Sequence, residues 1–186
     1  MKKKIVSLVL VFAMALALGI GGTIAWLTDT TGEVMNTFTV GNIDIELEET
    51  TGSEYKMVPG NTLSKNPTVT VKAGSEKSWV FVKIEKSSNF DDFMSFEIAD
   101  DWTALPNETG VYYCEVDAVN ADTDFAVLKD NKVIVKDTVT KAMMDAITDE
   151  TEPTLTFTAY AIQYSKGESN FTASEAWTEL NKQPAA

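Results

Sequence analysis

The acidic stretch that follows residue 116 offers oxygen ligands at a spacing that suits a metal ion. Asn120, Asp122 and Asp124 occupy alternate positions, as the first ligands of a calcium-binding loop do. The match to the EF-hand loop then fails, because Phe125 stands where that loop needs glycine. A solvated hairpin turn explains the same residues without an ion. The sequence therefore leaves two interpretations open, a plain turn or a single calcium site at these three residues, and it predicts no other cofactor.

Histidine is absent from the chain, and this absence excludes several kinds of catalytic site. Without histidine there is no Ser-His-Asp or Cys-His nucleophile and no His-Glu-x-x-His zinc motif. The single cysteine, Cys114, alternates with Tyr112 and Val116 and is therefore predicted to be a small core residue, a reactive thiol being the alternative. Carboxylate-only chemistry survives, as in glycosidases, but no pair of acids is singled out. We therefore predict that the chain is not an enzyme.

The charge of the chain argues against nucleic acid as a partner. Its 186 residues carry a net charge of −13, and all 15 basic residues are lysine. An acidic surface without guanidinium groups is poorly suited to binding phosphates. Such a surface also repels copies of itself, so any self-assembly must rest on backbone pairing and apolar contacts.

The N-terminus has the three parts of an export signal. Lysines at 2–4 precede an apolar run over 5–20, and small residues follow it. We predict a signal peptide helix over 1–25, cut at 25/26 or 26/27, and hence a secreted protein of the extracellular matrix or cell surface that meets the membrane only during export. An uncleaved anchor is the alternative, because residues 5–27 carry no charge and roughly 20 apolar residues can span a bilayer. The predicted cleavage region comprises Thr23, Ala25, Trp26 and Leu27.

An alternating pattern of apolar and polar residues dominates the rest of the chain and predicts strands. The clearest predicted strands cover 43–47, 68–72, 79–86, 111–116, 131–136 and 154–164. The strand over 79–86 is apolar on both faces and should be central. Two short helices are predicted, one over 138–147 capped by Asp137 or Thr138, and one after the capping box of Thr172 and Glu175. The pattern predicts an all-β fold, a single antiparallel β-sandwich over 41–186.

Three motifs give the chain a resemblance to a known family. Residues 22–29 read Gly-Thr-Ile-Ala-Trp-Leu-Thr-Asp, residues 36–45 read Asn-Thr-Phe-Thr-Val-Gly-Asn-Ile-Asp-Ile, and residues 58–61 read Val-Pro-Gly-Asn. Over about residues 20–85 the chain resembles the TasA/camelysin (CalY) family of Gram-positive bacteria. Leu27 replaces the phenylalanine of the family pattern and Val40 replaces its alanine.

The resemblance implies a function as well as a fold. It implies processing by a SipW-type signal peptidase, a jelly-roll-like sandwich, and assembly into biofilm matrix fibres with copies of itself or related matrix subunits. The chain would act as a fibre subunit or an accessory to such fibres. In that mechanism residues 26–40 would be donated as a strand to the next subunit, where an added strand satisfies an open sheet edge. The candidate anchors of this donor strand are Leu27, Val34, Phe38 and Val40.

Two alternatives accompany this hypothesis. The segment over 26–40 would instead pair within its own subunit, or the chain would be a non-polymerising surface or secreted binding protein. The second alternative expects exposed aromatic residues, with Trp79, Trp102 and Tyr113 as candidates. Camelysin has also been described as a metalloprotease, an activity that the lack of histidine argues against here.

Overall fold

The computed structural model describes residues 42–52 and 55–182. The predicted signal peptide over 1–25 and the predicted donor segment over 26–40 lie outside the described residues, as do the cleavage-region residues and the four donor-strand candidates. The strands of the described part are β1 (Ile45–Glu48), β2 (Thr62–Ser64), β3 (Thr68–Val71), β4 (Ser78–Lys86), β5 (Met94–Ser95), β6 (Thr103–Ala104), β7 (Val111–Val116), β8 (Thr123–Ala126), β9 (Lys132–Val135) and β10 (Leu155–Gln163). The helices are α2 (Phe90–Phe93), the 3-10 turn η1 (Lys129–Asn131), α3 (Lys141–Asp145) and α4 (Ala173–Leu180).

One layer of the fold is a four-stranded antiparallel sheet in the order β10-β4-β7-β6. β4 and β10 pair along nine residues each, from Leu155 opposite Lys86 to Gln163 opposite Ser78. β4 lies between two neighbours, as its apolar residues on both faces predict. β10 forms the edge of this sheet. Its first residues form one wall of the candidate site.

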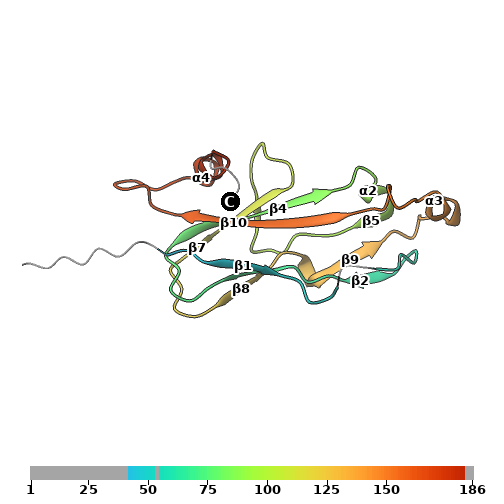
Figure 1. The fold of residues 1–186 in the computed structure, drawn as a ribbon, viewed down its shortest axis with the longest axis horizontal. Helices are drawn as coiled ribbons and strands as arrows, with labels where there is room; N and C mark the ends of the chain where they lie inside the picture. The colour runs from blue at the N-terminus through green and yellow to red at the C-terminus, as the bar shows by residue number, and fades with distance from the viewer. Residues whose placement is uncertain (1–41, 53–54, 183–186) are drawn as a thin grey trace, which may run out of the picture. The chain divides into compact units, whose positions relative to one another are not determined.

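The second layer consists of two smaller antiparallel sheets, β1-β3-β8 and β2-β9-β5 (Figure 1). Alternate residues of both layers point into one shared core, as period-two strands require. Its fully buried members include Val69, Val80, Val82, Val127, Leu128 and Val135. The prediction of an all-β sandwich with a few short helices is therefore confirmed.

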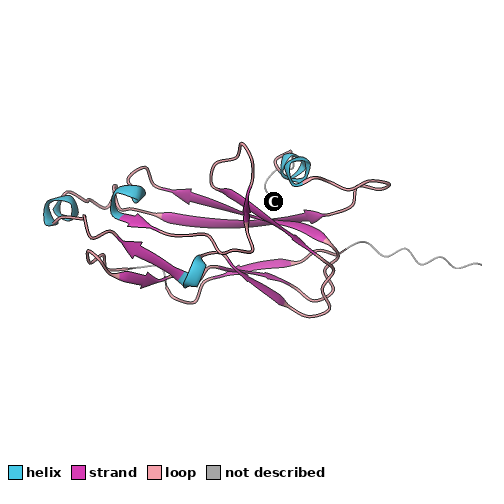
Figure 2. Cartoon of the chain, turned by 180° about the vertical axis from the view of Figure 1, so that it is seen from behind, coloured by secondary structure: helices cyan, strands magenta, loops and turns pink. Residues whose placement is uncertain are grey.

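A second apolar cluster covers the outer face of the four-stranded sheet. Phe81 of β4 is fully buried there, with its ring centroid 5.3 Å from that of Trp177 on α4. α4 begins at the predicted capping box, in which Thr172 and Glu175 exchange side-chain and backbone hydrogen bonds. The backbone N–H of Thr172, and then Lys166, lower the pKa of Glu175 to about 2. Figure 2 shows α4 lying against this sheet, which places a third layer at one end of the sandwich.

The helix expected over 138–147 is shorter than predicted. α3 begins at Lys141, and its N-cap is Thr140, whose hydroxyl accepts the N–H of Met143. The predicted caps, Asp137 and Thr138, are wrong. The cause lies in the preceding turn, where the N–H of Val139 donates to the carbonyl of Lys136 and Val139 enters the core with 4% exposure. Because Val139 is buried in the core, residues 138–140 are not helical, and the helix begins at Lys141.

Candidate functional site

The outer edge of β10 presents backbone groups that no other strand of the described part pairs. The N–H of Tyr164 donates to the carbonyl of Lys77, which fixes the alternation of hydrogen-bonded pairs along β10 and β4. In such an antiparallel pair every second residue turns its N–H and C=O away from the partner strand. The residues that do so here are Leu155, Phe157, Ala159 and Ala161. Their side chains point into the core, so an added strand at this edge would also cover core residues.

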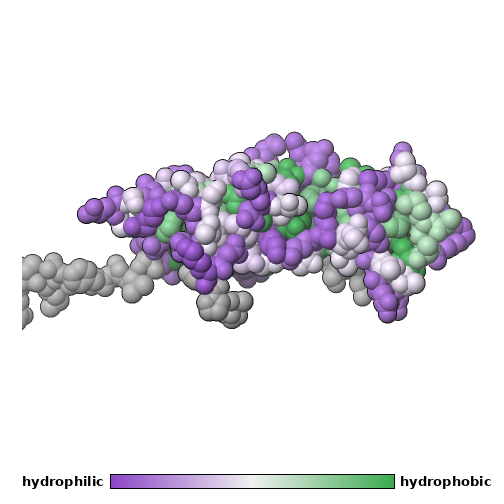
Figure 3. All heavy atoms as spheres, turned by 90° about the horizontal axis from the view of Figure 1, so that it is seen from above, coloured by the Kyte–Doolittle hydropathy of each residue, from purple (hydrophilic) through white to green (hydrophobic). Residues whose placement is uncertain are grey.

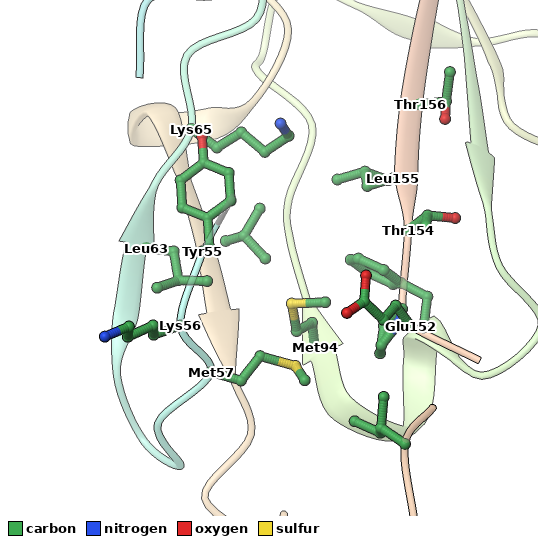
Figure 4. Close-up of a pocket in the computed structure, with 14 residues that line it drawn as sticks. Tyr55, Lys56, Met57, Leu63, Lys65, Met94, Glu152, Thr154, Leu155 and Thr156 are labelled. Atoms are coloured by element: carbon green, nitrogen blue, oxygen red, sulfur yellow. The ribbon is translucent and has the colours of Figure 1, made fainter. Parts of the chain in front are cut away.

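A groove of about 830 Å³ runs beside the first residues of β10. Figure 4 shows Leu155 and Glu152 on one side of it, Tyr55, Met57 and Leu63 on the other, and Met94 between them. Phe90 and Val133, both core residues, also line it. The groove therefore opens directly onto the core, between the edge of the four-stranded sheet and the sheet that contains β2.

A charged bridge stands at one end of the groove. Lys65 donates to both carboxylate oxygens of Glu49 at 2.8 and 2.7 Å, and the Tyr55 hydroxyl donates to the same carboxylate at 2.9 Å. The Lys65 ammonium also lies 5.6 Å from the centre of the Phe157 ring. Burial of Glu49 opposes ionisation, but the hydrogen bonds from Lys65, Tyr55 and Thr51 hold the pKa of Glu49 below its ordinary value. The bridge thus joins the strand β2 side of the groove to the β10 side.

The described chain begins at the opposite end of β10. The N–H of Glu76 donates to the carbonyl of Asn42, and the next residue, Lys77, is bonded to Tyr164 just beyond the end of β10. Leu155, beside the groove, is nine residues away along the strand, a separation of about 30 Å at 3.3 Å per residue. Whatever precedes Asn42 therefore joins the domain at the end far from the groove.

A comparison with known protein families shows to which family the chain belongs. A family model described as camelysin metallo-endopeptidase matches residues 1–156. The chain belongs to the camelysin family. No curated protein and no solved structure gives a match. The resemblance seen in the N-terminal motifs is thereby confirmed at the level of the family.

The family description implies a metal site, and the residues of this camelysin-family chain do not fit a zinc site of the usual kind. Zinc sites in proteins are built from histidine, cysteine and carboxylate ligands, and this chain has no histidine and one cysteine. Across residues 42–52 and 55–182 there is no group of three or more histidine, cysteine, aspartate or glutamate side chains that could hold a metal ion. None of the helices in the same ranges is long and apolar enough to cross a membrane.

Asn120 and Asp122 lie on the exposed turn between β7 and β8, whereas Asp124 lies on β8, and both aspartates already have partners. Asp122 accepts the N–H of Ala73 at 2.8 Å, and this bond is the main cause that lowers the pKa of Asp122. Asp124 accepts the hydroxyl of Thr70 at 2.7 Å. These bonds tie the turn to β3 without an ion. Calcium binding at Asn120, Asp122 and Asp124 stays a prediction that a calcium titration would test.

The aromatic residues proposed as an exposed binding surface are in large part buried. Trp79 is 9% exposed, and its ring N–H donates to the carbonyl of Phe171 at 2.8 Å. Trp102 is 6% exposed and donates to the carbonyl of Ala126 at 2.9 Å. Tyr113 is half-buried against Trp79. The expectation that Trp79 and Trp102 are exposed is wrong, because each indole has both an apolar pocket and a backbone acceptor.

Sequence reasoning missed the residues of the groove. Met57 and Leu63 fall outside the predicted strands, and Phe90 and Met94 fall in a stretch without clear periodicity. The groove forms only when these separate segments meet beside β10, which no local pattern records. One feature of the sequence could have indicated the groove. Large apolar residues occur there in segments that are too short or too irregular to bury them without contacts from other segments.

The burial of Cys114 leads to a prediction about the reactivity of its thiol. Cys114 of β7 is buried in the core, and burial raises its pKa to about 12. Because the thiolate is the reactive form, the native protein should not react with a disulfide reagent such as DTNB at pH 8, whereas the protein in denaturant should release one equivalent. Rapid labelling of the native protein would contradict the burial of Cys114.

Proposed function

We propose that the mature chain is a secreted subunit of an extracellular matrix fibre, in which residues 26–40 of one copy add as a strand to the groove beside β10 of the next. The observation that carries the proposal is that a strand edge left unpaired by the other described strands lies beside an open groove, which is lined by both apolar and polar side chains. Either feature alone is common at the edge of a sandwich. Together they offer a strand both its hydrogen bonds and pockets for its alternate side chains.

The sequence of the segment suits this groove. Val34, Phe38 and Val40 have the same parity, so in an extended strand they share one face, and the residues between them are mostly polar. This pattern matches a strand with one face toward a core and the other toward water. The chain has a net charge of −13, so apolar and backbone contacts must overcome the repulsion between copies.

The positions of the two ends favour assembly between copies. The segment joins its own domain at Asn42, about 30 Å along β10 from the groove at Leu155. A second copy placed end to end brings its groove to the segment without a reversal of the chain. The donated strand would then run antiparallel to β10. Such a head-to-tail contact leaves a free groove at one end and a free segment at the other, so it propagates as an open polymer.

The remaining parts of the proposal concern export and the role in the matrix. We propose cleavage by a SipW-type signal peptidase near Ala25, location outside the cell, and no catalytic activity. The chain would serve as the main fibre subunit or as an accessory that joins related matrix subunits. A non-polymerising binding protein is the alternative, and the burial of Trp79 and Trp102 removes the aromatic surface on which that hypothesis depended.

Electron microscopy of two forms of the protein tests the proposal. The mature chain that begins at Trp26, incubated for hours at physiological salt, should form filaments with a regular subunit repeat. Deletion of residues 27–35 should leave a folded monomer, because the deleted residues precede the described domain, which begins its pairing at Ile45. Circular dichroism and size-exclusion chromatography check folding and mass.

Two results would contradict the proposal. Intact filaments from the deleted chain would show that the segment is not the donor strand. Stable monomers of the mature chain, with no binding of a synthetic peptide of residues 26–40, would remove self-assembly altogether. Filaments that disassemble when the peptide of residues 26–40 is added in excess would support the proposal, because the peptide competes with the donated strand for the same groove.

A further inference from the structure

We infer that the end of the domain that carries α3 is a second contact surface for the neighbouring copy of this chain, separate from the groove. The inference rests on the proposed function. We define the α3-end patch as Val58, Ala142, Met143, Met144, Ala146 and Ile147. Val58 is 48% exposed, which makes it one of two large apolar residues so exposed within the described ranges. Figure 3 shows apolar side chains gathered at the α3 end of the surface.

The patch is continuous with the mouth of the groove. Ile147 belongs to the patch and also lines the groove, and Met57, the neighbour of Val58, lines it from the other side. The turn after Val58 is bonded to β9, since the N–H of Gly60 donates to the carbonyl of Val135. Figure 1 shows this turn and α3 at the same end of the sandwich. Apolar residues, with Lys56 and Glu152 among them, therefore lie on both sides of the place where a donated strand would enter.

A short tether forces the donor's domain onto this patch. Only Gly41 separates Val40, the last residue of the donor segment, from Asn42, which is already bonded to Glu76 of its own domain. Two residue steps span about 7 Å. A strand held in the groove up to Val40 must therefore bring its own domain against the mouth. A longer linker between Val40 and Asn42 would allow the patch to stay exposed to solvent, but Gly41 is the only residue between them.

The end of the domain that carries Asn42 has apolar residues to meet the patch. Val119 exchanges backbone hydrogen bonds with Gly74 and Ser75, beside the turn that holds Asn42. The exposed Ala118 and Ala121 flank Val119 in this loop. Met143, Met144 and Ile147 are half-buried and pack against the core of their own domain, so the exposed members of the patch are Val58, Ala142 and Ala146. These three side chains on one copy would pack against the alanine side chains on the other. The occupant of the patch is accordingly a second copy of this chain.

The test separates strand donation from the end-to-end contact. We choose as the patch variant Val58→Glu with Ala142→Glu, since Val58 and Ala142 are exposed and outside the groove lining. Thr103→Glu with Ala104→Glu, at the two exposed positions of β6, is the matched control, because it adds the same two negative charges. Fibre formation by each mature protein is followed by light scattering against concentration. Binding of a labelled peptide of residues 26–40 is followed by fluorescence anisotropy at concentrations too low for fibres.

We expect the patch variant to change fibre formation and to leave peptide binding unchanged. Desolvating two unpaired carboxylates in a contact should raise the concentration needed for fibres by about tenfold or more in the patch variant relative to the control, which carries the same added charge on β6. Peptide binding should stay the same in all three proteins. Equal fibre thresholds for the patch variant and the control, with peptide still bound, would overturn the patch alone. Failure of the wild-type protein to bind the peptide and to form fibres would overturn the patch together with the proposed function.

Discussion

Replacing Phe38 by aspartate is expected to abolish fibre assembly, whereas replacing Thr37 by aspartate is expected to leave it nearly unchanged. Neighbouring residues of a strand point to opposite faces. If Phe38 enters the groove, a carboxylate at that position loses its apolar burial and places a charge beside core residues such as Phe90 and Met94. The combined cost is several kcal/mol, since a buried aromatic side chain alone contributes about 1.5–3 kcal/mol. The aspartate at position 37 would face water.

The measurement is the concentration at which each mature protein begins to scatter light, with electron micrographs of the products. Both variants add one negative charge to the same segment, so the comparison cancels the change in repulsion between copies. Neither residue belongs to the described domain, so thermal unfolding should be the same for both proteins. Equal assembly of the two variants would show that the segment is not held as an alternating strand, and a loss confined to Thr37→Asp would reverse the assigned face.

The long strands could be predicted from the sequence because their patterns repeat over many residues. β4 and β10 each have nine residues with two distinct faces, and the residues predicted to share a face do pack together in the core. The capping box of α4 was equally visible, because Thr172 and Glu175 interact with each other locally. Family motifs at the N-terminus extended this prediction to the class of protein, and the match over residues 1–156 confirms it.

The groove and its rim could not be predicted, because they depend on contacts between distant segments. β2 and β5 have three and two residues, too few to show a period. The bridge between Lys65 and Glu49 joins residues 16 apart, and Lys65 lies over Phe157, far along the chain. The start of α3 failed for the same reason, since packing of Val139 in the core decided it. Local patterns thus identified β10, one wall of the groove, and missed the opposite wall formed by the segments around β2 and β5.

Phe81→Ala is expected to cause the largest loss of stability, about 3–5 kcal/mol in the free energy of unfolding. Phe81 is fully buried on the central strand β4, yet it faces the outer cluster and not the shared core. Its ring contacts Trp177 and lies 6.3 Å from the ring of Tyr113. Removing it opens a cavity between the sheet and α4.

Urea unfolding followed by circular dichroism measures this loss, because the midpoint shifts in proportion to the free energy of unfolding at constant slope. Lys83→Ala is the matched control, since Lys83 lies on the same face of β4 beyond α4 and pairs only with Glu85 at the surface. The control should be far less destabilised. A loss below about 1 kcal/mol for Phe81→Ala would mean that α4 contributes little to the fold. The expected large loss, with peptide binding retained, would instead show that α4 stabilises the outer face of the four-stranded sheet while the edge at β10 remains available to a neighbouring strand.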